Sequence, residues 1–228
     1  MAKSISPNFK FQGTVGVITF VNSPTYGHHP RAARGTNTEI VVTDSMQKAV
    51  DNMNLCNQQA QPVYAALKSE YHDGRLWSRL LSLFQKEQKA GRKISVERLL
   101  HLECNITYKL ENILPHQYKI AVRKDQKKLQ VTVDLPKHPK VEDTLPRQGY
   151  KLRVVVLYPD FNKMTCRKEV AMTEVIKYKS PLQPQELEVK MPSAKTRYMV
   201  LLCLVPILTG GEPIYFAKDA GMRVVAVG

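Results

Sequence analysis

Long apolar runs are missing from this chain of 228 residues. The most apolar window, residues 198–208, is about 11 residues long, whereas a helix needs roughly 20 apolar residues to span a bilayer. Residues 1–10 likewise lack the apolar stretch of roughly 7–15 residues that a secretory signal carries. We therefore expect a soluble, cytoplasmic protein without a membrane segment.

Cysteine is scarce, and its spacing excludes the common redox and zinc motifs. The four cysteines are Cys56, Cys104, Cys166 and Cys203, so the chain has no CxxC pair. In a reducing compartment, cysteines spaced in this way usually act as small buried hydrophobes. We expect free thiols in the core and no structural disulfide.

Motifs for catalysis, metal binding and nucleotide binding are also absent. The chain has no Gly-x-Ser-x-Gly elbow, no GxxxxGK[ST] loop and no GxGxxG loop. The six histidines form no HxH or HExxH pattern, and the adjacent pair His28-His29 would point to opposite faces of an extended segment. We expect no metal, no cofactor, no small-molecule ligand and no catalysis. Because a catalytic triad is defined by geometry, an enzyme is the third alternative.

Positive charge is present in excess. The chain has 34 Lys and Arg residues against 20 Asp and Glu residues, a formal net charge of +14. Lysines that flank an exposed tyrosine can neutralise phosphates while the ring stacks on a base, although hairpin tips and edge strands also carry solvated lysines for solubility. A basic nucleic-acid-associated protein is therefore the alternative function. The candidate polyanion-binding residues are Arg123, Lys124, Lys127, Lys128, Arg167, Lys168, Lys177, Tyr178 and Lys179.

Residues 1–40 have the pattern of a short β-hairpin or extended arm. Apolar and small residues alternate over residues 13–21, and an Asn-Ser-Pro turn follows at residues 22–24. Such an arm can add a strand to a neighbouring subunit, so we predict self-association. The candidate contact residues are Phe11, Val15, Val17, Ile18 and Phe20.

A helical period replaces the alternation in residues 41–105. Thr43 is a suitable N-cap for a first amphipathic helix, which Pro62 should kink or interrupt. A second helix is expected after Gly74. A short third helix from Ser95 is expected to turn Leu100 inward with its other apolar residues.

From residue 106 to the end the pattern predicts strands. The expected strands cover residues 118–123, 129–135, 150–158, 169–178, 186–191, 198–205 and 221–227, with a weak extra run at 214–216. Short strands without helical spacers favour antiparallel pairing in an immunoglobulin-like or fibronectin III-like sandwich. Tyr198, which follows the turn at residues 193–196, has the position of a tyrosine corner, and a plain hairpin is the alternative there.

Several segments resemble a bacterial protein family. These are Gly13-Thr14-Val15-Gly16, the basic stretch 31–34 and the strand segments 154–160 and 187–202. Over about two thirds of its length the chain is similar in pattern to a family of small uncharacterised bacterial proteins, a domain of unknown function, although its helical middle departs from that pattern. The resemblance implies a C-terminal sandwich and assigns no catalytic residue.

Together these patterns predict an α+β protein with three parts. They are a β-arm in residues 1–40, a helical segment in residues 41–105 and an immunoglobulin-like sandwich in residues 106–228. The predicted function is that of a non-enzymatic structural or protein-interaction module that acts by surface recognition and forms a homo-oligomer. Sandwiches of this kind also occur in bacteriophage and mobile-element structural proteins, an analogy at the level of fold alone.

Overall fold

The computed structural model describes residues 13–23, 27–32, 42–114, 118–139, 146–214 and 220–228. Two compact units are present, Met1–Gln47 and Lys48–Gly228. The predicted boundary at residue 105 marks a change of secondary structure but falls inside the second unit. Among the described residues, no helix has both the length and the apolar character needed to cross a bilayer.

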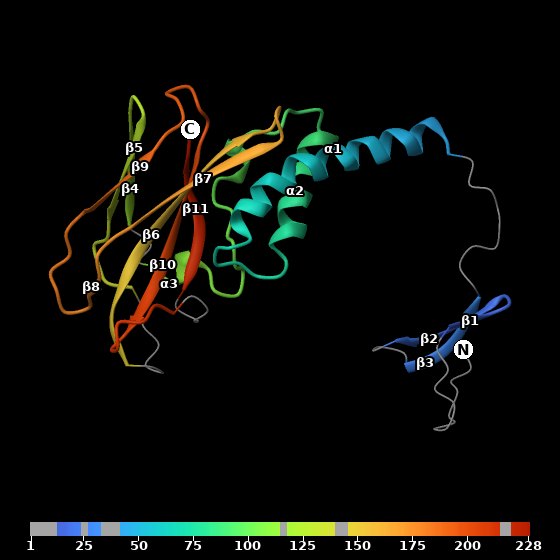
Figure 1. Ribbon diagram of the computed structural model, residues 1–228, viewed down its shortest axis with the longest axis horizontal. Helices are drawn as coiled ribbons and strands as arrows, with labels where there is room; N and C mark the ends of the chain where they lie inside the picture. Colours follow the sequence, from blue (N-terminus) through green and yellow to red (C-terminus); the bar gives the residue numbers. More distant parts are fainter. Residues whose placement is uncertain (1–12, 24–26, 33–41, 115–117, 140–145, 215–219) are drawn as a thin grey trace. The chain divides into compact units, whose positions relative to one another are not determined.

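The first unit contains a three-stranded antiparallel sheet (Figure 1). Its strands are β1 (Gly13–Val15), β2 (Ile18–Ser23) and β3 (Gly27–Ala32). A two-residue turn joins β1 to β2, and its first residue, Gly16, has a φ of +59°, which glycine adopts without strain. The predicted hairpin is therefore part of a sheet with one more strand. The turn predicted at residues 22–24 marks the end of β2, and most of the connection to β3 lies outside the described residues.

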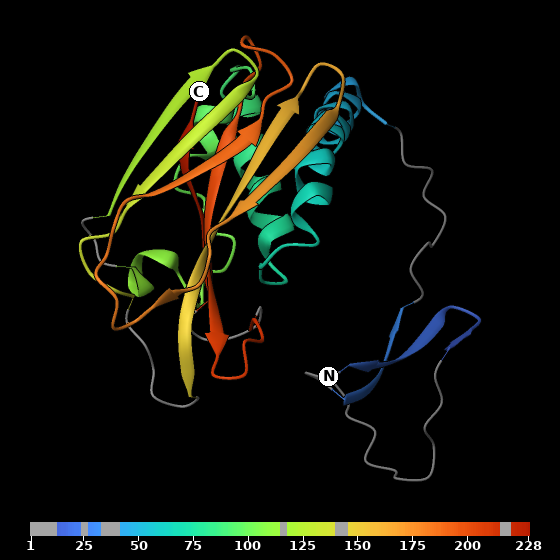
Figure 2. The ribbon, with the colours of Figure 1, turned by 60° about the vertical axis from the view of Figure 1, so that its left-hand side comes forward.

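The second unit contains a central sheet, a smaller sheet and a layer of helices. The central sheet has the strand order β11-β10-β6-β7, and the short β8 pairs with β6. The smaller sheet has the order β4-β5-β9, and Figure 2 shows its three strands side by side. All pairings are antiparallel. The strands are β4 (Lys119–Asp125), β5 (Lys128–Asp134), β6 (Arg147–Asp160), β7 (Thr165–Met172), β8 (Ile176–Lys177), β9 (Gln185–Lys190), β10 (Met199–Leu208) and β11 (Gly221–Val227).

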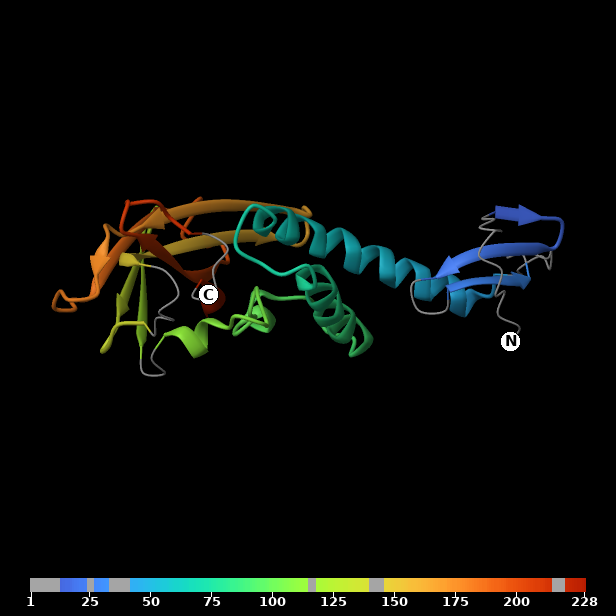
Figure 3. The same cartoon turned by 90° about the horizontal axis from the view of Figure 1, so that it is seen from below.

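Four helical segments accompany these sheets. They are α1 (Asp44–Leu67), α2 (Leu76–Lys89), the 3₁₀ helix η1 (Val96–Leu99) and α3 (Leu110–Ile113). The predicted N-cap is present, because the amide of Met46 donates to Oγ1 of Thr43 at 3.3 Å. Figure 3 shows α1 as one continuous helix, so Pro62 does not interrupt it. Buried residues lie on both sides of Pro62, so both halves of α1 are packed in the core: Cys56, Ala60, Val63 and Leu67.

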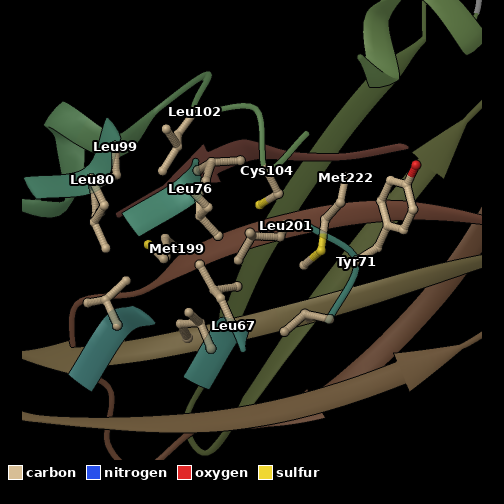
Figure 4. Packing of buried hydrophobic residues seen from close by; sticks show 14 of the residues in the cluster. Leu67, Tyr71, Leu76, Leu80, Leu99, Leu102, Cys104, Met199, Leu201 and Met222 are labelled. Carbon is tan, nitrogen blue, oxygen red and sulfur yellow. The ribbon is translucent and has the colours of Figure 1, made fainter. Parts of the chain in front are cut away.

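Two apolar cores lie on opposite faces of the central sheet. In β10, Met199, Leu201 and Cys203 pack against the helices, whereas Val200 and Leu202 pack against the smaller sheet. Figure 4 shows the first core, where leucines of α1, α2 and η1 point toward side chains of β10 and β11. Because both of its faces are buried, β10 is apolar throughout rather than alternating. The helical segment and the strands share this core, which explains why they form one compact unit.

Some local predictions were wrong at the edges of elements. The strand expected over residues 169–178 is divided into β7 and β8, because Oγ1 of Thr173 accepts the amide of Leu152 at 3.0 Å and the ladder stops there. Leu100, expected to point inward, is 37% exposed because η1 ends at Leu99. The helix α3 was not predicted. Most of the weak run at 214–216 lies outside the described residues.

A buried carboxylate joins the segment after α1 to the central sheet. The Glu70 side chain is 5% exposed. It accepts hydrogen bonds from Nη2 of Arg153 in β6 and from Nζ of Lys168 in β7, both at 3.0 Å. Two cations from neighbouring strands therefore balance one carboxylate that has almost no access to water.

A second network joins the α1–α2 connection to the chain before α3. The Asp73 carboxylate accepts hydrogen bonds from Nη1 of Arg79 at 2.8 Å, from the amide of Arg75 at 2.8 Å and from the amide of Ile106 at 2.9 Å. Nη2 of Arg79 donates in turn to the carbonyl oxygen of Cys104 at 3.0 Å. Burial by itself raises the pKa of Asp73, but these hydrogen bonds outweigh burial and hold the pKa below its ordinary value.

Replacing Asp73 with asparagine should therefore destabilise the protein most at neutral pH. A carboxylate whose pKa is depressed by folding stabilises the protein above its unfolded pKa of about 3.9, and this contribution is lost as the pH falls through the folded pKa. We expect Asp73→Asn to cost about 1–3 kcal/mol at pH 7 and the difference from wild type to shrink below about pH 4. Urea unfolding at a series of pH values measures this difference, with the exposed Glu186→Gln as control. A difference in the free energy of unfolding that stays constant down to pH 2 would contradict the prediction.

Candidate functional site

The N-terminal sheet has one apolar and one polar face. In the β1–β2 and β2–β3 pairings, Val15 lies opposite Ile18, Ile18 opposite Ala32, and Phe20 opposite Pro30. Residues that are directly opposite in an antiparallel pair share a face. These five residues therefore form the apolar face of the sheet. The polar pair Asn22 and His28 ends this face beyond Phe20. The other face is mostly polar, although Val21 also lies on it, and the hydroxyl groups of Thr14 and Thr19 are 2.9 Å apart there.

Much of this apolar face is accessible to solvent. Val15 is 58% exposed and Ile18 is 44% exposed, and Val17 in the β1–β2 turn is 70% exposed. A small sheet with one apolar face needs a second layer for stability. The described residues of the first unit supply only one layer. The apolar face is therefore the candidate interaction site of the chain.

The structure brings together three of the five predicted arm residues. Val15, Ile18 and Phe20 lie on the apolar face, and Val17 lies beside it in the turn. Phe11 lies outside the described residues. The two-residue alternation of the sequence was sufficient to identify these positions. Pro30 and Ala32 were missed, because β3 has a mixed sequence, Gly-His-His-Pro-Arg-Ala, with no alternation of its own.

The predicted polyanion-binding residues are spread over three places. Arg123, Lys124, Lys127 and Lys128 are together at the β4–β5 turn, whereas Arg167 and Lys168 are in β7, and Lys177, Tyr178 and Lys179 are in or just after β8. Lys168 lies opposite Leu157 and Lys177 lies opposite Gly149 along β6. Eight residues of strand at about 3.3 Å each separate these two lysines by roughly 26 Å. Only the first four residues can act as one cluster.

Several of these side chains have partners within the protein. Nζ of Lys128 is 2.8 Å from the Glu188 carboxylate, and Nζ of Lys124 is 4.8 Å from the centre of the Tyr198 ring. Lys168 binds Glu70. The sequence analysis missed these partners because they lie far away along the chain.

Tyr178 is a poor platform for stacking on bases. Its ring packs on Tyr150 and His138, with ring centres 5.3 and 6.1 Å apart. The ring is half-buried, and this burial raises the pKa of Tyr178. His138 fixes this cluster, since its ring nitrogens lie 3.1 Å from the hydroxyl of Tyr150 and 3.0 Å from the carbonyl oxygen of Ser180.

The thiols have the environment of core residues. All four cysteines are free, and Cys56, Cys104 and Cys203 are buried. Burial raises the pKa of Cys166 and of Cys203 to about 12, so the reactive thiolate is scarce at neutral pH. Within the described part of the chain, no group of three or more His, Cys, Asp or Glu residues is arranged to hold a metal ion.

The chain was also compared with known proteins. No protein-family model, no curated protein and no solved structure matches it. The exposed apolar face and the chemistry of individual residues are therefore the observations on which a function can be based.

Proposed function

We propose that this chain is a non-enzymatic structural or protein-interaction module that self-associates through its N-terminal sheet. The observation that carries this proposal is the exposed apolar face of β1–β3. Val15 and Ile18 together keep a large part of their surface in water, and burying such surface contributes about 25 cal/mol per Å². A second copy offers the same apolar face, and a twofold axis brings the two faces together.

Face-to-face packing suits this sheet better than the addition of a strand to its edge. β1 is only three residues long, and β3 contains Pro30, which has no amide hydrogen to donate. Two sheets that pack face to face form a layer about 10 Å thick. Ile18 and Phe20 lie in the middle strand, so they would occupy the centre of that layer.

The larger unit would then serve as the body that this sheet assembles. We propose that its two sheets form a sandwich of the immunoglobulin or fibronectin III kind. The strand orders β4-β5-β9 and β7-β6-β10-β11 support this. In sandwiches of that kind the first, second and fifth strands share one sheet, and the third, sixth and seventh strands share the other. We also propose that the protein works in the cytoplasm, and its four free thiols support a reducing compartment.

Self-association predicts a mass above that of one chain. We expect the wild-type protein to elute as an oligomer of its 25.9 kDa chain in size-exclusion chromatography with light scattering. The double variant Val15→Asp/Ile18→Lys should be a monomer, because it replaces apolar contact surface with a pair of charges that must lose their hydration when the two faces meet. The matched control is Thr14→Asp/Thr19→Lys on the polar face, which should keep the wild-type mass.

Two results would refute this proposal. One is a wild-type protein that is monomeric at all concentrations, and the other is an oligomer that both double variants leave unchanged. The alternative, a basic nucleic-acid-associated protein, is supported by the net charge of +14. Titration with single- and double-stranded DNA at two salt concentrations tests it, because affinity for phosphates falls steeply as salt rises.

A further inference from the structure

A groove runs over the surface of the second unit. Its lining residues lie between residues 49 and 197, so it shares no residue with the apolar face of the N-terminal sheet. It consists of three adjoining hollows with volumes of about 240, 390 and 590 Å³. The first and second hollows share Gln88. The second and third share four residues, Lys93, Ile94, Phe161 and Asn162. The groove therefore leads from the space between α1 and α2, past the β6–β7 turn, to the loop before β10.

One end of the groove is an apolar hollow. Ala49, Met53 and Cys56 of α1 line it, opposite the last turn of α2. Nε2 of Gln85 donates to Sδ of Met53 at 2.7 Å, and Nε2 of Gln88 donates to Oδ1 of Asn52 at 3.3 Å. These hydrogen bonds hold α1 and α2 at a fixed separation. The hollow has room for apolar side chains of a bound segment.

Each of the three hollows carries unpaired positive charge. Five cations line the groove, namely Lys89, Arg92, Lys93, Lys195 and Arg197. Arg92 is held by Glu87, and Arg197 is held by Glu97, with nitrogen to oxygen distances of 3.0 Å in both pairs. Among the described residues, no carboxylate forms a salt bridge with the three lysines. They are exposed, so their ammonium groups can meet a ligand without losing an internal partner.

The acidic side chains of the groove do not cancel this charge. Glu97 is occupied by Arg197. Oδ1 of Asp160 accepts the amides of Asn162 and Lys163 at 3.1 and 3.0 Å, so its position is fixed by the β6–β7 turn. Asp160 keeps its charge, but Glu97 and Asp160 are only two carboxylates against the five cations that line the groove. The groove thus combines an apolar hollow with lysines that lack a counter-charge.

We infer that this groove binds an acidic segment of a partner protein, with apolar side chains in the α1–α2 hollow and carboxylates beside Lys93 and Lys195. The N-terminal sheet of a second copy fits less well, because residues 13–23 and 27–32 contain no carboxylate that could meet the lysines. A single-stranded nucleic acid also fits less well, because stacking of its bases needs exposed aromatic rings. Phe161 packs edge-on against Phe84 with ring centres 5.6 Å apart, and Tyr158 is buried with its hydroxyl bonded to the carbonyl oxygen of Lys190.

Fluorescence anisotropy tests this inference on the full chain. The probe is a labelled peptide in which glutamates are interspersed with leucines, and the comparison probes are the same peptide with lysine for each glutamate and a single-stranded DNA of similar charge. We expect the acidic peptide to bind and the basic peptide not to bind. Lys93→Glu/Lys195→Glu should weaken binding about tenfold, which corresponds to about 1.4 kcal/mol. The matched control is Lys119→Glu/Lys190→Glu on the outer face of the smaller sheet, which should change affinity less than twofold.

A second variant tests the apolar end independently of charge. Ala49→Phe fills the hollow from an exposed position, so it should weaken binding of the acidic peptide while the far-UV circular dichroism stays unchanged. No binding of the acidic peptide, an equal loss in both charge-reversed proteins, or tighter binding of the DNA through Lys93 and Lys195 would overturn the inference. Val15→Asp/Ile18→Lys should bind the peptide like wild type, which separates this groove from self-association.

Discussion

Replacing Glu70 with alanine is expected to lower the free energy of unfolding by about 3–5 kcal/mol, because it leaves two partly buried cations, Arg153 and Lys168, without a counter-charge. The Glu70 side chain is 5% exposed, and those of Arg153 and Lys168 are 20% and 28% exposed. Without the carboxylate, the Arg153 guanidinium stays between the sheet and the chain after α1 with no negative charge to compensate for its lost hydration. Urea unfolding followed by circular dichroism measures the loss.

An exposed ion pair supplies the control for this prediction. Lys128 and Glu188 are 2.8 Å apart, but their side chains are 59% and 55% exposed. Glu188→Ala should therefore cost less than about 1 kcal/mol. Replacing Glu70, Arg153 and Lys168 together with methionine should recover much of the stability lost in Glu70→Ala, since no charge is then left buried. Equal costs for Glu70→Ala and Glu188→Ala would show that Glu70 is not buried as described.

Leu201→Ala and Leu202→Ala should each cost about 2–5 kcal/mol, although these two neighbours point to opposite faces of β10. Both side chains are fully buried, Leu201 beneath the helices and Leu202 beneath the smaller sheet. Each truncation removes apolar contacts and leaves a cavity that neighbours fill only in part. Thermal and urea unfolding give the two free-energy changes.

The comparison of these two leucines tests the layered arrangement directly. If the helices were detached from the sheet, Leu201 would face water and its truncation would cost little. Val170→Ala is the control, because Val170 lies in the edge strand β7 and is 41% exposed. We expect this control to change stability by less than about 1 kcal/mol.

The strands of the second unit could be predicted because local patterns determine them. Turn residues and β-branched residues placed most of the long strands within a few residues of their observed bounds, and the exception is the strand predicted over residues 169–178, which is divided into β7 and β8. Which elements pack against these strands was harder to predict from the sequence. The amphipathic pattern of α1 predicts that one face of the helix is buried. Nothing in the sequence of α1 identifies β10 and β11 as the strands that bury it. For this reason the sequence left open whether the helical segment docks on the strands.

Charge was the least predictable property, because its effect depends on partners that are distant along the chain. Lys168 is 98 residues from Glu70, and the sequence alone suggested that Lys168 was free to bind phosphates. The apolar face of the N-terminal sheet was easier to predict, since alternation along β2 is a local signal. The groove was not predicted, because its walls come from four separate segments.

The burial of β10 and of residues 154–159 of β6 on both faces has a consequence for how this molecule can change over evolutionary time. In a strand with one wet face, every second position tolerates substitution, whereas here neither odd nor even positions do. Substitutions should therefore be tolerated best at exposed positions, such as the outer face of the smaller sheet, the edge strand β7, the exposed side of α1 and the connections. New partner specificities have to arise at those places, while the middle of the fold stays fixed.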